Sequence, residues 1–368
     1  MKKQKKNKRS LLGLLPYAIG AVCGGFLGYF GMEGIFEGNG LEIAILILSF
    51  VVIVYGLIIT HEAGHLVCGL LSGYKFVSFR IGSIIFVKRG DKILRKKFSI
   101  PGTGGQCLLD PPDKDEHGNY PAVLYNLGGG LSNLLFSAIG FIGMALCPPE
   151  TTGRTVCLIL GLAGLYFAAT NLFPMKVGGV ANDGCNIRTF RKDRESADAF
   201  WAQMRINKLQ QTDGMRLAEI PEGYFELPEG DFDGNPLVEG IAVMAMQRLM
   251  DQGRFSQAQA AGEKLLGSAK LMPYYKNFVQ MELLFLELIG PCRQEEVDRL
   301  YTNQLKKFMK SVKGYPNTQR TLYAYAVRFS KDEEAARKAR NSFEKTLNKY
   351  PTLGDIRAEQ RLMEVIER

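Results

Sequence analysis

Apolar residues are concentrated in the first half of the chain, where they form four continuous stretches, at residues 11–32, 41–71, 121–146 and 155–173. Each stretch is long enough to cross the hydrocarbon core of a bilayer, roughly 30 Å thick, as an α-helix. After Arg188 the sequence contains no comparable stretch. The pattern therefore predicts a polytopic α-helical membrane protein with about four spans, followed by a polar part.

Between the second and third stretches the pattern changes to short alternating runs at residues 76–81, 83–88 and 92–100, which predict a small β-sheet or hairpin. Glycine and proline then accumulate at residues 101–112, and we expect a loop there.

Beyond Arg188 the chain shows helical periodicity with turn residues between the segments, which predicts short antiparallel helix pairs. The segments are residues 240–252, 256–266, 273–288, 294–312, 317–329, 332–349 and 353–366. Residues 250–258 look like a tetratricopeptide-type turn, but only one such unit is legible, so a plain helical bundle is equally expected.

These patterns predict four parts. We expect a basic cytosolic N-terminus with the first span at residues 1–40, and a membrane-embedded core with a β-sheet insertion at 41–186. A linker or helical connection at 187–235 and a cytosolic, soluble all-α domain of helical hairpins at 236–368 follow.

The placement of Lys and Arg predicts the orientation, because basic residues near the ends of spans stay on the cytoplasmic side. Six lie within residues 2–9 and eight within 75–97, whereas the turn at 33–40 has none. Both termini and the middle loop are therefore expected in the cytoplasm, with the spans in a bacterial cell membrane. A cleaved signal peptide at residues 1–32 is the alternative. The net charge of +9 calls for no nucleic acid, because much of the excess lies beside the lipid surface.

Histidine supplies the first candidate chemistry. The chain has only three histidines, and two of them lie four residues apart in the motif His61-Glu62-Ala63-Gly64-His65. On an α-helix this spacing puts both imidazoles on one face, where they can bind one metal ion. Glu62 can then take a proton from water at that ion, as a general base does.

The surroundings of this motif argue against a chance occurrence on a soluble helix. Residues 43–59, directly before it, carry no charge. Ionisable groups that continue such a helix are costly in lipid unless they pair, bind an ion or face water, so they mark a functional site.

A catalytic zinc site normally has three protein ligands and one open position. We expect Asp183, in Asn182-Asp183-Gly184, as the third ligand, because the second and fourth spans end on the same side of the membrane. A simple tight turn is the alternative interpretation of that tripeptide. His117 and Cys185 are rival ligands. Two imidazoles and a carboxylate suit zinc, although cobalt or iron could also bind them.

Taken together, the motifs resemble those of the site-2 protease family of intramembrane zinc metalloproteases. Three matches carry the resemblance over roughly residues 40–190: the His61 to His65 motif, Gly128-Gly129-Gly130-Leu131-Ser132-Asn133, and Asn171-Leu172-Phe173-Pro174 followed by Asp183-Gly184.

The resemblance implies a three-helix core with a membrane-associated β-structure. It also implies that His61, His65 and Asp183 bind one zinc ion, that Glu62 is the catalytic base, and that Asn133 and Asn171 lie near the substrate channel. The spacing from Asn171 to Asp183 is longer than in the family, by an insertion at residues 176–179. The glycines at 128–130 have an equally good role in close helix packing.

We therefore expect an intramembrane zinc metalloprotease that hydrolyses peptide bonds in or near the transmembrane segments of membrane-protein substrates. The expected partners are these substrates, the lipid bilayer, and a protein partner or regulator on the helical domain. One alternative is a catalytically inactive membrane scaffold that holds a partner through that domain. Another is a metal transporter, but the spans offer almost no polar residues away from the one motif.

Overall fold

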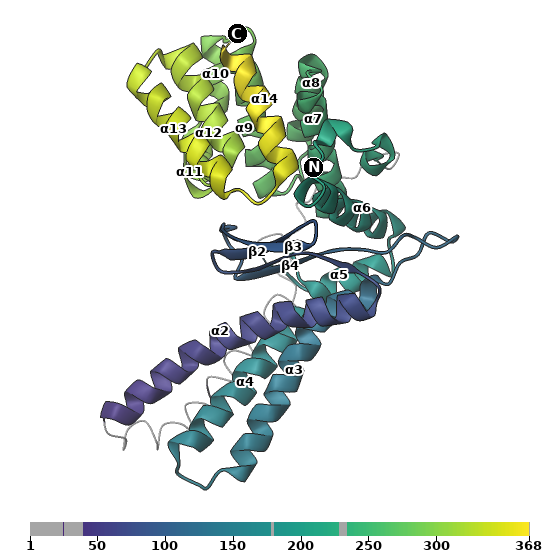
Figure 1. Cartoon of the computed structure of the whole chain (residues 1–368), viewed down its shortest axis with the longest axis vertical. Coiled ribbons are helices and arrows are strands. Elements are labelled where there is room, and N and C mark those ends of the chain that lie inside the picture. The colour runs from purple at the N-terminus through teal and green to yellow at the C-terminus, as the bar shows by residue number, and fades with distance from the viewer. Residues whose placement is uncertain (1–24, 26–39, 178–179, 228–233, 368) are drawn as a thin grey trace, which may run out of the picture. The chain divides into compact units, whose positions relative to one another are not determined.

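The computed structural model describes residue 25 and residues 40–177, 180–227 and 234–367 (Figure 1). Apart from Gly25, the predicted span at residues 11–32 lies outside these residues. The chain forms two compact units: residues up to Tyr74 together with 114–192, and residues 75–113 together with 193 to the C-terminus.

Three apolar helices dominate the first unit: α2 (Gly40–Leu71), α3 (Ala122–Leu146) and α4 (Thr152–Leu172). Within the described residues, these are the helices long and apolar enough to cross a membrane. They lie at the second, third and fourth predicted stretches, so those three helices are confirmed. Helix α4 begins slightly earlier than expected because the Thr151 side chain accepts a hydrogen bond from the Arg154 amide and caps it.

The outer surface of α2 fits lipid better than water. Large apolar side chains such as Ile47, Leu48 and Val52 are more than 60% exposed. In water each would forgo roughly 1.5–3 kcal/mol of burial energy, whereas lipid is as apolar as the side chains themselves. With 32 residues, α2 is about 48 Å long, which exceeds the hydrocarbon core. Part of it therefore lies beyond the core unless the helix tilts.

Glycines bring the three helices into close contact. A Cβ atom on Gly64 would lie 2.2 Å from the carbonyl oxygen of Gly128, and one on Gly140 would lie 2.3 Å from the amide nitrogen of Gly161. Only a residue without a side chain fits at such crossings between backbones. The packing role predicted for the 128–130 glycines is thus realised at Gly128.

The first unit ends with a short antiparallel hairpin and a helix. The hairpin consists of β5 (Lys176–Val177) and β6 (Val180–Ala181), and helix α5 (Asp183–Phe190) follows and packs against α3 and α4.

The second unit contains an antiparallel sheet in the order β3-β2-β1-β4, made of β1 (Lys75–Ile81), β2 (Ile84–Arg89), β3 (Lys92–Lys97) and β4 (Gly105–Asp110). The three predicted runs form β1 to β3. The prediction of a loop over residues 101–112 is wrong for β4. Pairing with β1 explains the strand, because it buries Cys107 and Leu109 while the buried Arg80 donates to the Gly105 carbonyl at 2.9 Å.

The rest of the second unit is helical and matches the predicted segments closely. The elements are α6 (Arg194–Gln211), η2 (Leu217–Glu219), η3 (Glu222–Phe225), α7 (Pro236–Asp251), α8 (Phe255–Gly267), α9 (Pro273–Ile289), α10 (Gln294–Leu300), α11 (Asn303–Ser311), α12 (Pro316–Ala324), the π-helical turn η4 (Tyr325–Ser330), α13 (Glu333–Lys349) and α14 (Leu353–Glu367). The segment predicted as one helix at 294–312 is two, because Thr302 accepts from the Leu305 amide and starts α11.

Several contacts attach the sheet to these helices. The Lys96 ammonium donates to the Tyr350 carbonyl at 2.6 Å, and the Phe98 ring lies edge-on to the Tyr315 and Tyr350 rings. On the other side, Arg205 of α6 forms an ion pair with Asp110 at 2.9 Å. The sheet therefore groups with the C-terminal helices, whereas the sequence analysis assigned it to the 41–186 part; those domain boundaries stay a prediction.

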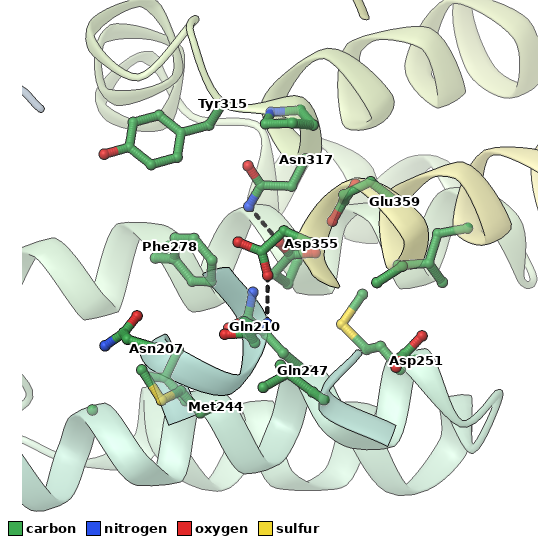
Figure 2. A pocket seen from close by; sticks show the side chains of 18 of the residues that line it. Asn207, Gln210, Met244, Gln247, Asp251, Phe278, Tyr315, Asn317, Asp355 and Glu359 are labelled. Carbon is green, nitrogen blue, oxygen red and sulfur yellow. Dashed lines mark hydrogen bonds between the residues drawn. The ribbon is translucent and has the colours of Figure 1, made fainter. Parts of the chain in front are cut away.

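Helices of this unit also surround a cavity of about 280 Å³ (Figure 2).

Candidate metal centre

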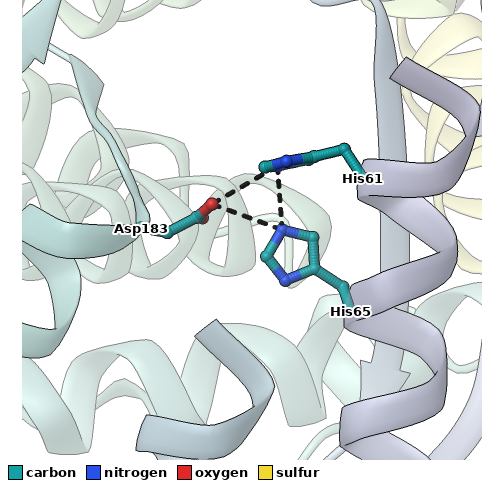
Figure 3. A group of neighbouring side chains, drawn as sticks. All are labelled: His61, His65 and Asp183. Atoms are coloured by element: carbon teal, nitrogen blue, oxygen red, sulfur yellow. Dashed lines mark hydrogen bonds and ion pairs between the residues drawn. The ribbon is translucent and has the colours of Figure 1, made fainter. Parts of the chain in front are cut away.

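The two histidines of the motif lie one turn apart near the C-terminal end of α2 and turn their rings toward the same point (Figure 3). Their Nε2 atoms are 3.1 Å apart, and the ring planes are nearly perpendicular. This is the arrangement that the four-residue spacing predicts for an α-helix.

Asp183 approaches the histidines from the first residue of α5. Its Oδ2 atom lies 3.3 Å from Nε2 of His61 and 3.4 Å from Nε2 of His65. Among the described residues, these three side chains form the one group of this kind that could hold a metal ion. His117 and Cys185, the rival third ligands, do not belong to it, and the His117 side chain is exposed on a loop.

The position of Asp183 is set by its two neighbours. Gly184 packs so closely on the end of α4 that a Cβ atom would lie 1.9 Å from the Leu172 carbonyl oxygen. On the other side, the side-chain oxygen of Asn182 accepts from the Cys185 backbone amide and so caps α5. The side-chain nitrogen of Asn182 donates to the Thr170 and Phe173 carbonyls. Asn182 therefore connects the last turn of α4 directly to the first turn of α5.

The long spacing between Asn171 and Asp183 is accommodated by the β5–β6 hairpin. At its base, the backbone N–H of Asn182 donates to the Met175 carbonyl, and the backbone N–H of Met175 donates to the side-chain Oδ1 of Asn182, both at 3.0 Å. The two ends of the segment therefore meet, so the added length does not separate Met175 from Asn182, which precedes Asp183.

The three facing atoms have the spacing of a tetrahedral metal site. Zinc bonds to nitrogen and carboxylate oxygen of about 2.0–2.1 Å imply ligand-to-ligand distances of about 3.3–3.4 Å in a regular tetrahedron. The observed distances are 3.1, 3.3 and 3.4 Å. Moreover, Oδ2 of Asp183 is buried and has no hydrogen-bond partner within the described part of the chain. The residues thus fit a divalent cation.

The tautomer of His65 is set by a backbone carbonyl. Its Nδ1 lies 2.8 Å from the Tyr125 carbonyl oxygen, which can only accept, so Nδ1 carries the proton. The lone pair of the neutral ring then lies on Nε2, which faces Asp183 and His61. A ligand histidine usually has such an acceptor for its second nitrogen.

His61 has the corresponding partner in Asn133, which is fully buried on α3. The amide nitrogen of Asn133 lies 3.1 Å from Nδ1 of His61, while its Oδ1 atom is buried and has no hydrogen-bond partner among the described residues, so the amide is better assigned with its nitrogen and oxygen exchanged. With the amide oxygen turned to that nitrogen, Nδ1–H donates to it and Nε2 keeps its lone pair for a metal. The structure therefore brings Asn133 against a predicted ligand; the role in substrate binding expected for it stays a prediction.

Gly129 lies directly opposite the imidazole rings. A Cβ atom there would lie 2.6 Å from both Nε2 atoms and 2.5 Å from Cε1 of His61. The residue after the packing glycine Gly128 thus leaves open the space beside the two Nε2 atoms, where a metal ion would bind.

Asp183 is ionised in this setting. Burial alone would raise the pKa of its carboxyl, but in the absence of a metal the facing His61 and His65 rings, when protonated, outweigh burial and lower the pKa to about 2. A carboxylate must be ionised to bind a metal, so Asp183 is in the required form at neutral pH.

The remaining predicted residues lie as follows. Glu62 is half-buried on α2, next to His61. The Asn171 amide donates to the Phe167 carbonyl of its own helix at 2.8 Å and does not join the three-residue group.

The family model of peptidase family M50 matches residues 49–349, which is most of the chain and includes every residue of the centre. The chain belongs to peptidase family M50. This is the site-2 protease family, a family of membrane zinc metalloproteases, so the resemblance inferred from the motifs is confirmed. The M50 match continues through α13, well beyond the residues that carry the motifs. No curated protein and no solved structure matches the chain.

Sequence reasoning did not give the roles that the Tyr125 carbonyl, Gly129 and Asn182 have at this M50 centre. Only Asn182 has a local signal for its role, because Asn before a short helical segment is a favoured N-cap. The other two act through backbone position, which no residue type reveals.

Proposed function

We propose that the chain is an intramembrane zinc metalloprotease that hydrolyses peptide bonds in or near the transmembrane segments of membrane proteins. The observation that carries this proposal is the convergence of His61, His65 and Asp183 at tetrahedral spacing, with Nδ1 of each histidine facing another partner. These three residues would hold one zinc ion.

Zinc supplies Lewis acidity when bound: it makes water acidic enough to lose a proton near neutral pH and polarises a carbonyl group. In the proposed reaction Glu62 takes the proton of the attacking water, whose oxygen adds to the carbonyl carbon of the peptide bond. Glu62 then gives this proton to the amide nitrogen as the C–N bond breaks. Asn133 holds the His61 ring, and we propose Asn171 as a polar contact for substrate near the same helix ends.

The charge pattern supports the orientation proposed for this enzyme. Basic residues at 2–9 and 75–97 favour the cytoplasmic side, so we propose four spans with both termini in the cytoplasm of a bacterial cell. The C-terminal helices would then be a cytosolic, tetratricopeptide-like domain available to a protein partner.

Metal analysis of the purified full-length protein in detergent tests the centre directly. The chain has three histidines, so His117→Ala is a matched control for His65→Ala. We expect about one zinc per chain in the wild type and in His117→Ala, and a large loss in His65→Ala. Equal zinc content in all three proteins would exclude the proposed ligands.

Proteolysis is tested by expressing wild type and Glu62→Gln in the same membranes and comparing cleavage products across the membrane proteome. Glu42→Gln, at the other end of α2, is the control. We expect fragments that depend on Glu62 and not on Glu42. If zinc is bound but no fragment depends on Glu62, the inactive scaffold that holds a partner becomes the better description.

A further inference from the structure

The cavity of the second unit is separate from the metal centre. It is partly open, and residues from α6, α7, α9, α12 and α14 line it, together with the ends of the loops before α12 and α14. Figure 2 shows side chains from these helices pointing into it. Its volume, about 280 Å³, lies just below the roughly 300–1,000 Å³ typical of small-molecule sites, which suits a group the size of one amino-acid side chain.

The lining of this cavity is strongly acidic although the whole chain is basic. Four carboxyl side chains line it, and within the described part of the chain no Lys, Arg or His does. The carboxyl groups are those of Asp251, Glu282, Asp355 and Glu359.

Two of these carboxyl groups share a single cation behind the cavity wall. Arg320, fully buried, forms ion pairs with Glu282 and, through Nε at 3.0 Å, with Glu359. Glu282 also accepts from the Asn317 amide at 2.8 Å. The Glu359 residue is only 8% exposed, and its Oε2 accepts no hydrogen bond of good geometry from any described residue. One guanidinium thus serves two buried carboxylates, and the Glu359 carboxylate is the less well satisfied.

The third carboxyl group forms no ion pair with a described residue. Asp355 accepts from the Gln210 amide at 2.5 Å and from the Tyr350 hydroxyl, both neutral donors. The fourth, Asp251, has its own cation in Arg216 at 2.7 Å. Four carboxyl groups therefore face two guanidinium groups, which leaves an excess of two negative charges when all are ionised.

Burial of this excess affects the acidity of the groups. Burial raises the pKa of Asp355 to about 6, because the hydrogen bonds from Tyr350 and Gln210 only partly offset it. Burial and the neighbouring negative charges raise the pKa of Glu359 to about 8, because the Arg320 charge only partly offsets them. Protons on these carboxyl groups can be displaced by a cation that enters the cavity.

Aromatic rings complete the lining. Tyr274, Tyr275, Tyr315 and Tyr350 contribute, and the Tyr315 and Tyr350 rings meet edge to face with centroids 5.9 Å apart. The faces of such rings attract cations, and a ring of tyrosines around a carboxylate is a favourable environment for alkylammonium and guanidinium groups.

We propose that this cavity is a binding site for an alkylammonium or guanidinium group, presented either by a small organic cation or by a basic side chain of a peptide. The size, the acidic lining without a basic residue, the poorly satisfied Glu359 and the tyrosine rings all favour this chemistry. The proposal does not depend on proteolysis, because no residue of the metal centre takes part.

Calorimetric titration of the full-length protein in detergent at pH 8.5, where Glu359 is mostly ionised, tests the proposal. The probes are N-acetyl-lysine-N-methylamide, a capped Gly-Gly-Lys-Gly-Gly peptide, and the same peptide with norleucine, which has no charge, in place of lysine. We expect saturable binding of the lysine probes and none of the norleucine peptide. Tighter binding of the peptide than of the single residue would identify a peptide as the source, and equal binding a small molecule.

Variants locate the site. Glu359→Gln should weaken binding of the lysine probes at least tenfold, and Asp355→Asn should do so as a second, independent change. Glu344→Gln, on the exposed surface of α13, is the matched control and should bind like the wild type. Emission of Trp201, the only tryptophan and part of this unit, verifies that each variant is folded. The proposal is overturned if no lysine probe binds, if the norleucine peptide binds equally, or if folded Glu359→Gln and Asp355→Asn bind like the wild type.

Discussion

Replacing Gly129 with alanine is the smallest change that enters the metal centre. The added methyl group would lie 2.6 Å from Nε2 of His61 and from Nε2 of His65. An ordinary contact needs about 3.4 Å, so the rings and the methyl group must separate by about 0.8 Å. Neither ring can retreat freely, because the Tyr125 carbonyl and the Asn133 amide hold their Nδ1 atoms.

The size of the effect follows from the tolerance of metal bonds. Functional metal sites keep their distances within about 0.2 Å, and loss of a single outer partner of a ligand already lowers metal affinity about 10–100-fold. A shift of 0.8 Å that is shared between two ligands exceeds that tolerance. We therefore expect Gly129→Ala to lower zinc affinity by at least about 100-fold.

The assay is competition of the purified protein with a fluorescent zinc indicator, after removal of metal with a chelator. Gly56→Ala is the matched control, because Gly56 lies on α2 and a Cβ atom there meets nothing within 4 Å. Alanine also favours a helix over glycine by up to about 1 kcal/mol, so this control should fold well and bind zinc like the wild type. Wild-type zinc affinity in Gly129→Ala would refute the assignment of the metal to this point.

Two further predictions concern the metal centre, and a third concerns Glu359 in the cavity. Asn133→Ala should lower zinc affinity about 10–100-fold in this assay, whereas Asn133→Asp, which keeps an acceptor oxygen, should retain most of it; equal affinities would argue against the positioning role. Asp183→Asn should lose zinc while Cys185→Ser keeps it, and the reverse result would make the thiolate the ligand. Because its pKa is raised, Glu359 keeps its proton in the folded state up to about pH 8, whereas in the unfolded chain it releases the proton above about pH 4.5. The free energy of unfolding should therefore fall as the pH rises between these two values. Denaturant titrations followed by Trp201 emission should show lower stability at pH 8 than at pH 6.5 and a smaller difference in Glu359→Gln, and an unchanged difference would contradict this.

The parts of the molecule with strong local patterns could be predicted from sequence. The helix α2, with its uncharged apolar run and the histidine pair, follows from composition and the helical period alone. The C-terminal helices follow from apolar periodicity and turn residues. In both cases, near neighbours in the chain determine the structure.

Features that depend on distant residues could not be predicted in this way. The strand β4 looks like a glycine- and proline-rich loop until it pairs with β1, and its burial comes from that pairing. Likewise, nothing next to Asn133 indicates that it faces His61, which lies 72 residues away.

The spacing between Asn171 and Asp183 shows which property of the motif matters physically. An insertion between two residues of a motif is harmless when its two ends are bonded to each other, because the ends then stay at the same distance from one another. Here the hydrogen bonds between Met175 and Asn182 close the hairpin, and Gly184 holds the other side of Asp183 against Leu172. Deleting the hairpin and connecting Met175 directly to Asn182 should therefore preserve zinc binding. By contrast, Asn182→Ala keeps the full length of the segment but removes the side-chain oxygen that accepts from the Met175 amide, so it should weaken zinc binding. The position of the third ligand thus depends on the anchoring of α5 to α4 and not on the number of residues between them.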